Sequence, residues 1–289
     1  MACKPIICTS SYLRTSSYTQ DIAKELFSAF NSIGIEHMEI SNTCDYWCRD
    51  YMPISLFDDG SYARYEYKPD YLWDKENHHK YITNQSDALS NFNIWTPSDM
   101  KILFDGGNYV RCDDKVLMTD KILMENPQWA LHMLFEHLRM SVMGDIVLIP
   151  WDMDDPCGHA DGIVAPLPDG RLLVNNYCQT AKGKKKAYYK RLLKILEPHF
   201  DLVELSYDCK PEKNSWCYLN FLRIGDAILL PCLTKNAECD NDQAAIELFK
   251  NLFPNFKVIP IYAYPLIKRG GALHCITWEY YTPPTTLNG

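Results

Sequence analysis

The stretch RGGALHCITW, Arg269–Trp278, places a cysteine directly after a glycine pair and a histidine. Two adjacent glycines allow a sharp turn or a close approach of the backbone. Cys275 follows this turn and leads into a run typical of a strand. Most other cysteines lie among apolar residues, where a thiol packs as a small inert group. Cys275 is therefore a candidate nucleophile delivered at an exposed turn, a role that would also need a lowered thiol pKa.

Two further segments hold polar residues against glycine or proline. WCRDYMP (Trp47–Pro53) sets Arg49 and Asp50 between an aromatic residue and a proline that fixes the local backbone. Alone, it is better explained by a surface turn with a solvated charge pair. FDGGN (Phe104–Asn108) places two glycines after an apolar run, which a tight turn explains about as well as a ligand contact.

DDPCGHADG (Asp154–Gly162) places His159 and Asp161 two residues apart. In an extended segment both side chains would point the same way, so an imidazole and a carboxylate could meet in one pocket. A structural histidine explains this segment equally well when it is taken alone.

Together these segments suit chemistry on a guanidinium, which is planar, cationic and able only to donate hydrogen bonds. Asp50 and Asp161 could each accept a fork of its N–H bonds from two sides. Its central carbon is a poor electrophile, so attack needs a strong nucleophile such as Cys275. His159 could protonate the departing nitrogen and deprotonate the incoming water.

Short strands and amphipathic helices alternate along the chain without a linker, which predicts one α/β domain, residues 1–289, with mixed sheets. We expect helices from Thr19, as the cap, to about Asn31, over Gln128–Val142 with Pro127 at the start, over a solvated Lys182–Leu196 and near Gln243–Leu252. Tyr71–Asp87 is the best candidate for a long surface loop. The expected strands are Lys4–Thr9, Ile35–Ile40, Ile54–Phe57, Ser61–Tyr65, Lys101–Phe104, Val116–Thr119, Asp145–Pro150, Gly162–Leu167, Leu172–Asn175, Leu202–Leu205, Tyr218–Leu222, Ala227–Leu230 and Lys257–Tyr262.

Composition narrows the class of partner. A formal net charge of −8 argues against nucleic acid and would attract small cations. No apolar run approaches the roughly 20 residues of a membrane span. Twelve cysteines without an export signal predict reduced thiols in a cytoplasm. Cys44 and Cys48 lack the second ligand pair of a zinc site.

With these segments in place, the chain resembles the guanidino-modifying enzymes, specifically the agmatine deiminase and Porphyromonas-type peptidylarginine deiminase family. WCRDYMP is similar to that family's W-x-R-D-x-G-P, GHADG to its G-H-x-D-G, and GGALHCIT to its G-G-x-x-H-C-x-T. CYLNF (Cys217–Phe221) resembles its Y-x-N-F. The resemblance runs in order from about Cys44 to Trp278.

The resemblance implies a pentein fold, an α/β propeller of five strand–strand–helix–strand units around a central site. It implies Cys275 as nucleophile, His159 as general acid and base, and Asp50 and Asp161 as the guanidinium clamp. No metal or organic cofactor is implied. It also implies substrate-binding positions, which are Trp47, Arg49, Asp105, Asn108, Asn220 and Gly271.

The implied reaction converts a guanidinium to a ureido group with release of ammonia. Agmatine, giving N-carbamoylputrescine in putrescine biosynthesis, is the first choice of substrate, with free or peptidyl arginine close behind. Met52 in place of glycine, Asp105 in place of glutamate and Cys157 in place of aspartate depart from the family pattern and leave the substrate open.

Two rival functions remain at this stage. An amidinotransferase shares the covalent intermediate, and a non-catalytic pentein would bind a partner without needing this set of side chains. The sequence also leaves open the oligomeric state, a homo-oligomer included. It does not decide whether Cys275 is a thiolate before substrate arrives.

Overall fold

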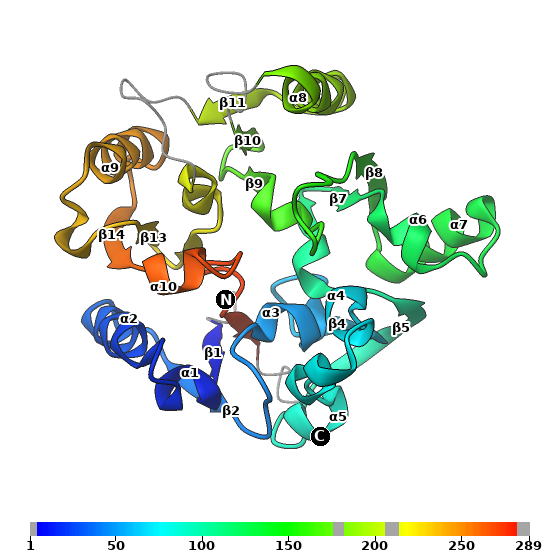
Figure 1. Ribbon diagram of the computed structural model, residues 1–289, viewed down its shortest axis with the longest axis horizontal. Helices are drawn as coiled ribbons and strands as arrows, with labels where there is room; N and C mark the ends of the chain where they lie inside the picture. Colours follow the sequence, from blue (N-terminus) through cyan, green and yellow to red (C-terminus); the bar gives the residue numbers. More distant parts are fainter. Residues whose placement is uncertain (1–4, 176–181, 206–213, 282–289) are drawn as a thin grey trace, which may run out of the picture.

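Five three-stranded sheets surround a common centre in the computed structural model (Figure 1), which describes residues 5–175, 182–205 and 214–281. Each sheet has the same topology. The middle strand pairs antiparallel with one neighbour and parallel with the other, and helical segments connect the parallel pair. This is the expected pentein arrangement of five repeated units, and it is confirmed.

The sheets follow the chain in order. They are β15-β1-β2 (Trp278–Tyr280, Ile6–Ser10, His37–Ile40), β3-β4-β5 (Ile54–Ser55, Ser61–Glu66, Trp95–Leu103), β6-β7-β8 (Val110–Cys112, Lys115–Thr119, Asp145–Ile149), β9-β10-β11 (Val164–Pro166, Leu172–Asn175, Leu202–Leu205) and β12-β13-β14 (Leu222–Ile224, Ala227–Cys232, Lys257–Tyr262).

The α-helices lie mostly at the rim, with α2, α7, α8 and α9 outermost in Figure 1. They are α1 (Ser11–Thr15), α2 (Gln20–Ser32), α3 (Cys48–Tyr51), α4 (Asp70–Trp73), α5 (Gln85–Ala88), α6 (Lys121–Glu125), α7 (Leu131–Val142), α8 (Gly183–Leu196), α9 (Asp240–Leu252) and α10 (Tyr264–Ile267). Short 3-10 turns are η1 (Glu76–Tyr81), η2 (Gly106–Asn108), η3 (Ala160–Gly162), η5 (Ser215–Leu219) and η6 (Lys235–Ala237).

The ring is closed by strands from opposite ends of the chain. Ile6 pairs with Tyr280 and Cys8 with Trp278 in antiparallel register. Tyr62 in the neighbouring sheet adds to this closure, since its hydroxyl donates to the Glu279 carbonyl at 3.2 Å. The segment that carries Cys275 therefore lies just before a strand held on both sides, which fixes its position.

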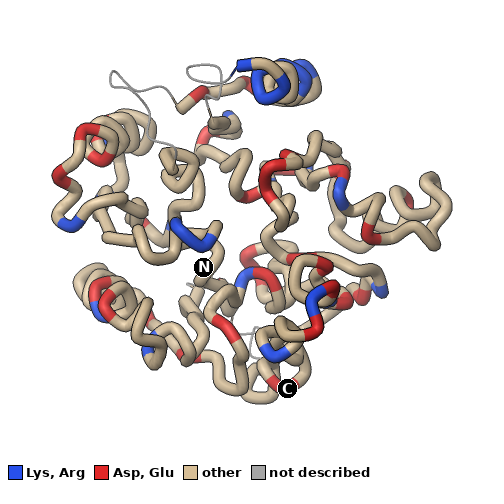
Figure 2. The backbone as a smooth tube through the Cα atoms, viewed as in Figure 1, with Lys and Arg blue, Asp and Glu red and all other residues tan. Residues whose placement is uncertain are grey.

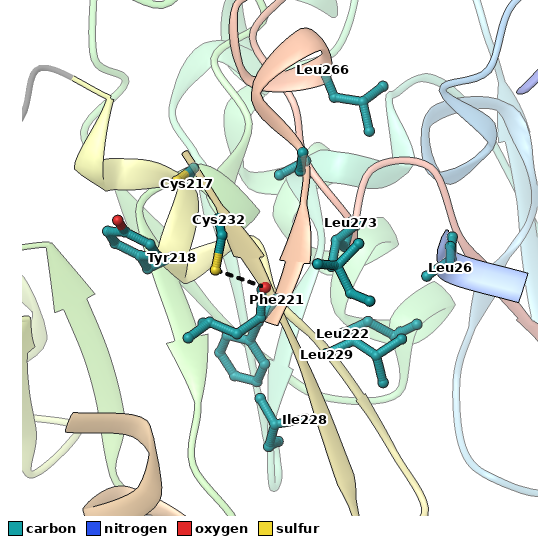
Figure 3. Packing of buried hydrophobic residues seen from close by; sticks show 14 of the residues in the cluster. Leu26, Cys217, Tyr218, Phe221, Leu222, Ile228, Leu229, Cys232, Leu266 and Leu273 are labelled. Carbon is teal, nitrogen blue, oxygen red and sulfur yellow. Dashed lines mark hydrogen bonds between the residues drawn. The ribbon is translucent and has the colours of Figure 1, made fainter. Parts of the chain in front are cut away.

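Apolar side chains fill the space between sheets and helices in three clusters. The first includes Leu26 of α2, Leu229 of β13 and Leu273 near the centre, and Figure 3 shows part of it. All three side chains are fully buried. Burial of one such leucine contributes about 1.5–3 kcal/mol.

Three predictions about local structure were wrong. Tyr218–Leu222 is not one strand, because η5 turns the chain before β12 and the Tyr218 hydroxyl donates to Asp242 at 2.7 Å. The helix expected from Gln128 starts at Leu131, after a turn in which Trp129 N donates to the Asn126 carbonyl.

The third error concerns Tyr71–Asp87, which is not a simple loop but contains η1, α5 and most of α4. The other expected strands and helices are present with shifts of their ends, most of them small; the strand expected at Lys101–Phe104 is longer, since β5 begins at Trp95. Lys4, the first residue of the expected first strand, lies outside the described residues. Thr19 does precede α2, but its hydroxyl donates to the Leu13 carbonyl at 2.7 Å and makes no capping bond.

Charged residues are unevenly distributed over the fold. Figure 2 shows Lys and Arg gathered along α8, the predicted solvated helix, which buries Tyr189, Leu192 and Leu196 against its sheet. Within the ranges described above, no helix is both long and apolar enough to cross a membrane.

Candidate active site

The four sequence segments meet where short turns converge between the sheets. Asp50 lies in α3, Asp105 directly precedes η2, His159 directly precedes η3, and Cys275 lies in the turn before β15. The first and last segments are joined by the backbone, since Arg49 N donates to the Cys275 carbonyl at 3.1 Å. Residues far apart in the chain therefore share one buried site.

Asp161 is the centre of one group of contacts. Its Oδ2 lies 2.7 Å from His274 Nδ1 and 3.5 Å from Cys275 Sγ. Asn220 Nδ2 donates to the same oxygen at 3.2 Å. Burial alone would raise the pKa of Asp161, but the hydrogen bond and charge of His274 outweigh it and lower that pKa. Asp161 is thus a carboxylate next to the sulfur.

Asn220 fixes the backbone that presents the sulfur. Its Oδ1 accepts hydrogen bonds from Ala272 N at 3.0 Å and Cys275 N at 3.2 Å, and its side chain is fully buried. Because η5 holds Asn220 in place, the turn containing Gly271 cannot shift without breaking both bonds. Its amide therefore ties the Cys275 turn to Asp161.

His159 is the centre of a second group of contacts. Its Nε2 lies 3.2 Å from Asp105 Oδ2, and its Nδ1 lies 3.6 Å from Asp50 Oδ1. The second distance is too long for a hydrogen bond. Asp50 Oδ1 is buried and has no hydrogen-bond partner. Gly107 is required beside it, since a Cβ there would overlap His159 Nδ1 and lie 2.8 Å from Asp50 Oδ1.

Burial and charge set the protonation states. Although burial disfavours the imidazolium, Asp50 and Asp105 raise the pKa of His159 to about 10. Burial raises the pKa of Asp50 well above its usual range. Burial, followed by the Asp161 and Asp50 charges, raises the pKa of Cys275 well above the ordinary thiol range. At neutral pH the site therefore holds an imidazolium and a neutral thiol.

Two details of the sequence interpretation were wrong. Cys275 is only 6% exposed and is not presented on the surface by its turn, because the side chains around Asp161 and Asn220 enclose it. His159 and Asp161 do not lie in an extended segment either. The chain turns at η3, so His159 faces Asp50 and Asp105 while Asp161 faces Cys275.

Other expected site residues make contacts that support the site. Arg49 Nη2 pairs with Glu279 Oε2 at 2.8 Å, and Asn108 Oδ1 accepts from Thr119 N at 2.8 Å. Trp47 packs over Gly271, where a Cβ would overlap the indole ring. These contacts connect α3 and η2 to the Cys275 turn and to β7.

A cavity of about 670 Å³ reaches this region from the turns between β3 and β4 and between β12 and β13. Its lining includes Asp161, His274 and the Arg49–Glu279 pair together with Asp58, Arg111 and Arg223, but not Cys275, His159 or Asp50. The part of the chain described here contains no cluster of His, Cys, Asp and Glu arranged to hold a metal ion.

A family model described as Porphyromonas-type peptidyl-arginine deiminase matches residues 8–280. The chain belongs to this family. A Legionella pneumophila relative, provisionally named an agmatine deiminase, is 23% identical over 203 residues, or 62% of this chain and 55% of the relative. A Marinomonas relative of the same name is 35% identical over 213 residues, covering 62% and 56%. This family member thus spans little more than half the length of these relatives.

Solved structures share the fold of this family member. The C. jejuni agmatine deiminase superposes with a TM-score of 0.70 at 17% identity over 97% of this chain and 94% of that one. A provisionally named arginine deiminase from Porphyromonas gingivalis gives 0.72 at 19% identity over 98% and 97%. An amidinotransferase from Microseira wollei gives 0.55 at 16% over 93% and 82%.

Sequence reasoning missed two side chains that this family member brings to the site. Glu279 interrupts the aromatic run Trp278–Tyr281, and a single charge among aromatic residues was a usable signal. Tyr71 was assigned to a surface loop, yet its ring lies 6.3 Å from the His159 ring, centroid to centroid. Its segment is polar overall, so no periodic pattern marked it as buried.

Proposed function

We propose that this protein hydrolyses a guanidinium group to a ureido group and releases ammonia through a covalent intermediate on Cys275. The observation that carries the proposal is a buried cysteine and histidine surrounded by three carboxylates, of which Asp50 keeps an unpartnered oxygen. Unpaired buried carboxylate oxygens are costly, and a cationic donor such as a guanidinium would satisfy them.

In the first step a guanidinium binds between Asp50 and Asp161. Its positive charge offsets the carboxylates that disfavour a thiolate, so substrate binding promotes loss of the Cys275 proton. Asp161 Oδ2 is an acceptor that Sγ already contacts at 3.5 Å. The sulfur then forms a bond to the central carbon and gives a tetrahedral adduct.

In the second step the His159 imidazolium donates its proton to the departing nitrogen, and the carbon–nitrogen bond breaks to release ammonia. An amidino-thioether remains on Cys275. Neutral His159 then takes a proton from water, the water oxygen bonds to the carbon, and the carbon–sulfur bond breaks. The oxygen-bound proton of the product passes to the Cys275 thiolate and leaves a neutral ureido group, while His159 keeps the proton that it took from water. The proton that Cys275 lost to solvent on substrate binding balances the ammonia as ammonium.

The contacts of the remaining expected site residues separate those that orient His159 and Cys275 from those that support these groups from behind. Asp105 orients the imidazole, and Asn220 orients the Cys275 backbone. We expect Arg49, Asn108 and Gly271 to support these groups from behind, because their contacts are with Glu279, Thr119 and Trp47. Trp47 would shape the approach to the site through its position on Gly271.

Agmatine is our first choice of substrate, with free or peptidyl arginine next. The net charge of −8 favours a small cation. The agmatine deiminase names of several relatives support the same choice. We further propose that residues 1–289 form one catalytic domain acting in the cytoplasm, where the free thiols of the described cysteines would stay reduced.

The test is ammonia release from agmatine, free arginine, a peptide with C-terminal arginine and a peptide with internal arginine. We expect ammonia and a ureido product from one of them, abolished by Cys275→Ala. Product analysis with an added amine would separate hydrolysis from amidino transfer. If no substrate released ammonia and Cys275 did not react with a haloacetamidine, the proposal would be overturned in favour of a binding protein.

A further inference from the structure

Tyr71 places a phenol beside the candidate site that no residue in the described ranges satisfies with a hydrogen bond. Its hydroxyl oxygen is buried and has no hydrogen-bond partner. Asp50 Oδ1 likewise accepts no hydrogen bond from a described residue, although it faces the His159 imidazolium, with Nδ1 at 3.6 Å, and Tyr71 packs against the same ring. Buried polar groups in native proteins are nearly always paired, so two unpaired ones at one place indicate a missing ligand.

The ring of Tyr71 packs against the ring of His159. The Tyr71 and His159 rings meet edge to face at an interplanar angle of 71°. Burial and then the charges of Asp105 and Asp50 raise the pKa of Tyr71 well above its usual range, so the group is a neutral phenol. The charges of these carboxylates act on the phenol, but its hydroxyl forms no hydrogen bond with either of them.

A buried lysine holds Tyr71 in this position. Asp70 Oδ1 accepts from Tyr71 N at 2.8 Å and pairs with Lys121 Nζ at 2.8 Å. Lys121 Nζ also donates to the Cys157 carbonyl at 3.0 Å, two residues before His159. Lys121 is 2% exposed, and its Nζ lies 5.2 Å from the Tyr71 ring centroid. The lysine thus ties α4 to the His159 segment through Asp70.

We propose that Tyr71 is a substrate-binding residue of this site, whose hydroxyl oxygen accepts a hydrogen bond from the bound guanidine, with Lys121 and Asp70 as its positioning residues. The inference rests on the proposed function. A guanidinium has only donors, so the phenol must act as the acceptor towards it. The phenol keeps its own proton in this arrangement, because burial raises its pKa well above the usual range.

The test compares Tyr71→Phe with Tyr81→Phe, a matched control. Tyr81 belongs to the same chain segment but is 39% exposed. Tyr71→Phe keeps the ring and removes only the hydroxyl. For ammonia release we expect KM to rise about tenfold or more with a smaller change in kcat, the effect of losing one buried hydrogen bond to a charged group. Tyr81→Phe should match the wild type.

Calorimetric binding of agmatine and of free arginine to Cys275→Ala protein separates the two proposals, because it needs no turnover. We expect Tyr71→Phe to weaken binding of the better ligand about tenfold in that background. If the wild type released ammonia but Cys275→Ala bound the ligand equally well with and without Tyr71→Phe, the role of Tyr71 would be overturned and the deiminase proposal would stand. If no guanidine gave ammonia but Tyr71→Phe still weakened binding, the deiminase proposal would be overturned and the role of Tyr71 in binding would stand. No binding to either protein would overturn both.

The positioning part is tested by Asp70→Asn, and by Lys121→Met if that protein folds. We expect each to raise KM in the same direction as Tyr71→Phe. When combined with Tyr71→Phe, neither should add its full effect, because residues that act through one contact are not additive. Full additivity of Asp70→Asn and Tyr71→Phe would overturn the positioning role.

Discussion

The two halves of the candidate site differ in how completely their polar atoms are paired. In the Cys275 half, made of Asp161, Asn220, His274 and Cys275, Asp161 Oδ2 contacts the other three side chains. In the His159 half, made of Asp50, Tyr71, Asp105 and His159, two buried oxygens have no partner. The first half is therefore already paired in the free protein, whereas we propose that a bound guanidine completes the second.

The largest effect should come from the His159 half. His159→Gln removes the proton donor and acceptor, so kcat should fall by roughly 10²–10⁴-fold, the usual contribution of a positioned general acid or base. Steady-state ammonia release would measure it, and circular dichroism would check the fold. His132→Gln, on exposed α7, is the matched control and should leave kcat unchanged. A loss of less than tenfold in His159→Gln would exclude His159 from proton transfer.

The next largest effect should be seen in the rate at which Cys275 is alkylated. Because the pKa of Cys275 is raised, its reaction with neutral iodoacetamide at pH 7 should be at least about tenfold slower than that of free glutathione. The rate should keep rising above pH 9, as the thiolate forms. Chloroacetamidine, a cation, should react faster than iodoacetamide, since it binds the same carboxylates. Mass spectrometry of the Cys275 peptide gives both rates. A fast, pH-independent reaction with iodoacetamide would show a preformed thiolate instead.

Asn220→Ala tests the organised half. It leaves Ala272 N and Cys275 N without their acceptor, so the free energy of unfolding should fall by about 1–3 kcal/mol. Turnover should fall as well, because the Cys275 turn loosens. Urea unfolding measures the first effect, with exposed Asn93→Ala as the control. Equal stability of Asn220→Ala and Asn93→Ala would contradict the positioning role.

Asp50→Asn should have the smallest effect on stability and the opposite sign. Burial raises the pKa of Asp50, so the folded state binds this proton more tightly than the unfolded state. Stability is therefore lost as pH rises above about 4, the ordinary aspartate pKa, because the unfolded state releases this proton there while the folded state keeps it. At pH 7, Asn at this position should leave the free energy of unfolding unchanged or raise it by up to about 1 kcal/mol while turnover collapses. Asp161→Asn should instead destabilise. If both variants lost stability equally, the two halves would not differ as described.

Local patterns in the sequence were enough to predict most strands and helices, because apolar periodicity follows burial. They also singled out Cys275, His159, Asp50 and Asp161, because each lies in a short polar segment that contains a glycine or a proline; their catalytic roles remain predictions. The fold itself came from the resemblance of four ordered motifs. Periodicity alone does not indicate that β15 returns to pair with β1.

The sequence did not predict the contacts that depend on distant residues. Tyr71 lies in a polar segment, and the contact between its neighbour Asp70 and Lys121, some fifty residues later, could not be read from that segment. The Gly-Gly turn predicted an exposed Cys275, but exposure depends on Asn220 and Asp161, which come from other sheets. Protonation states were equally out of reach, because they are set by charges that meet only in the folded chain.

The central claim is that Cys275 forms a bond to the guanidine carbon, and acid quenching during turnover tests it most directly. The quenched protein would be digested and the cysteine peptides weighed by mass spectrometry. We expect the Cys275 peptide to gain the mass of the substrate less one ammonia, with the adduct absent in Cys275→Ala. Turnover with every cysteine peptide unmodified, or with the added mass on Cys157, would contradict the account.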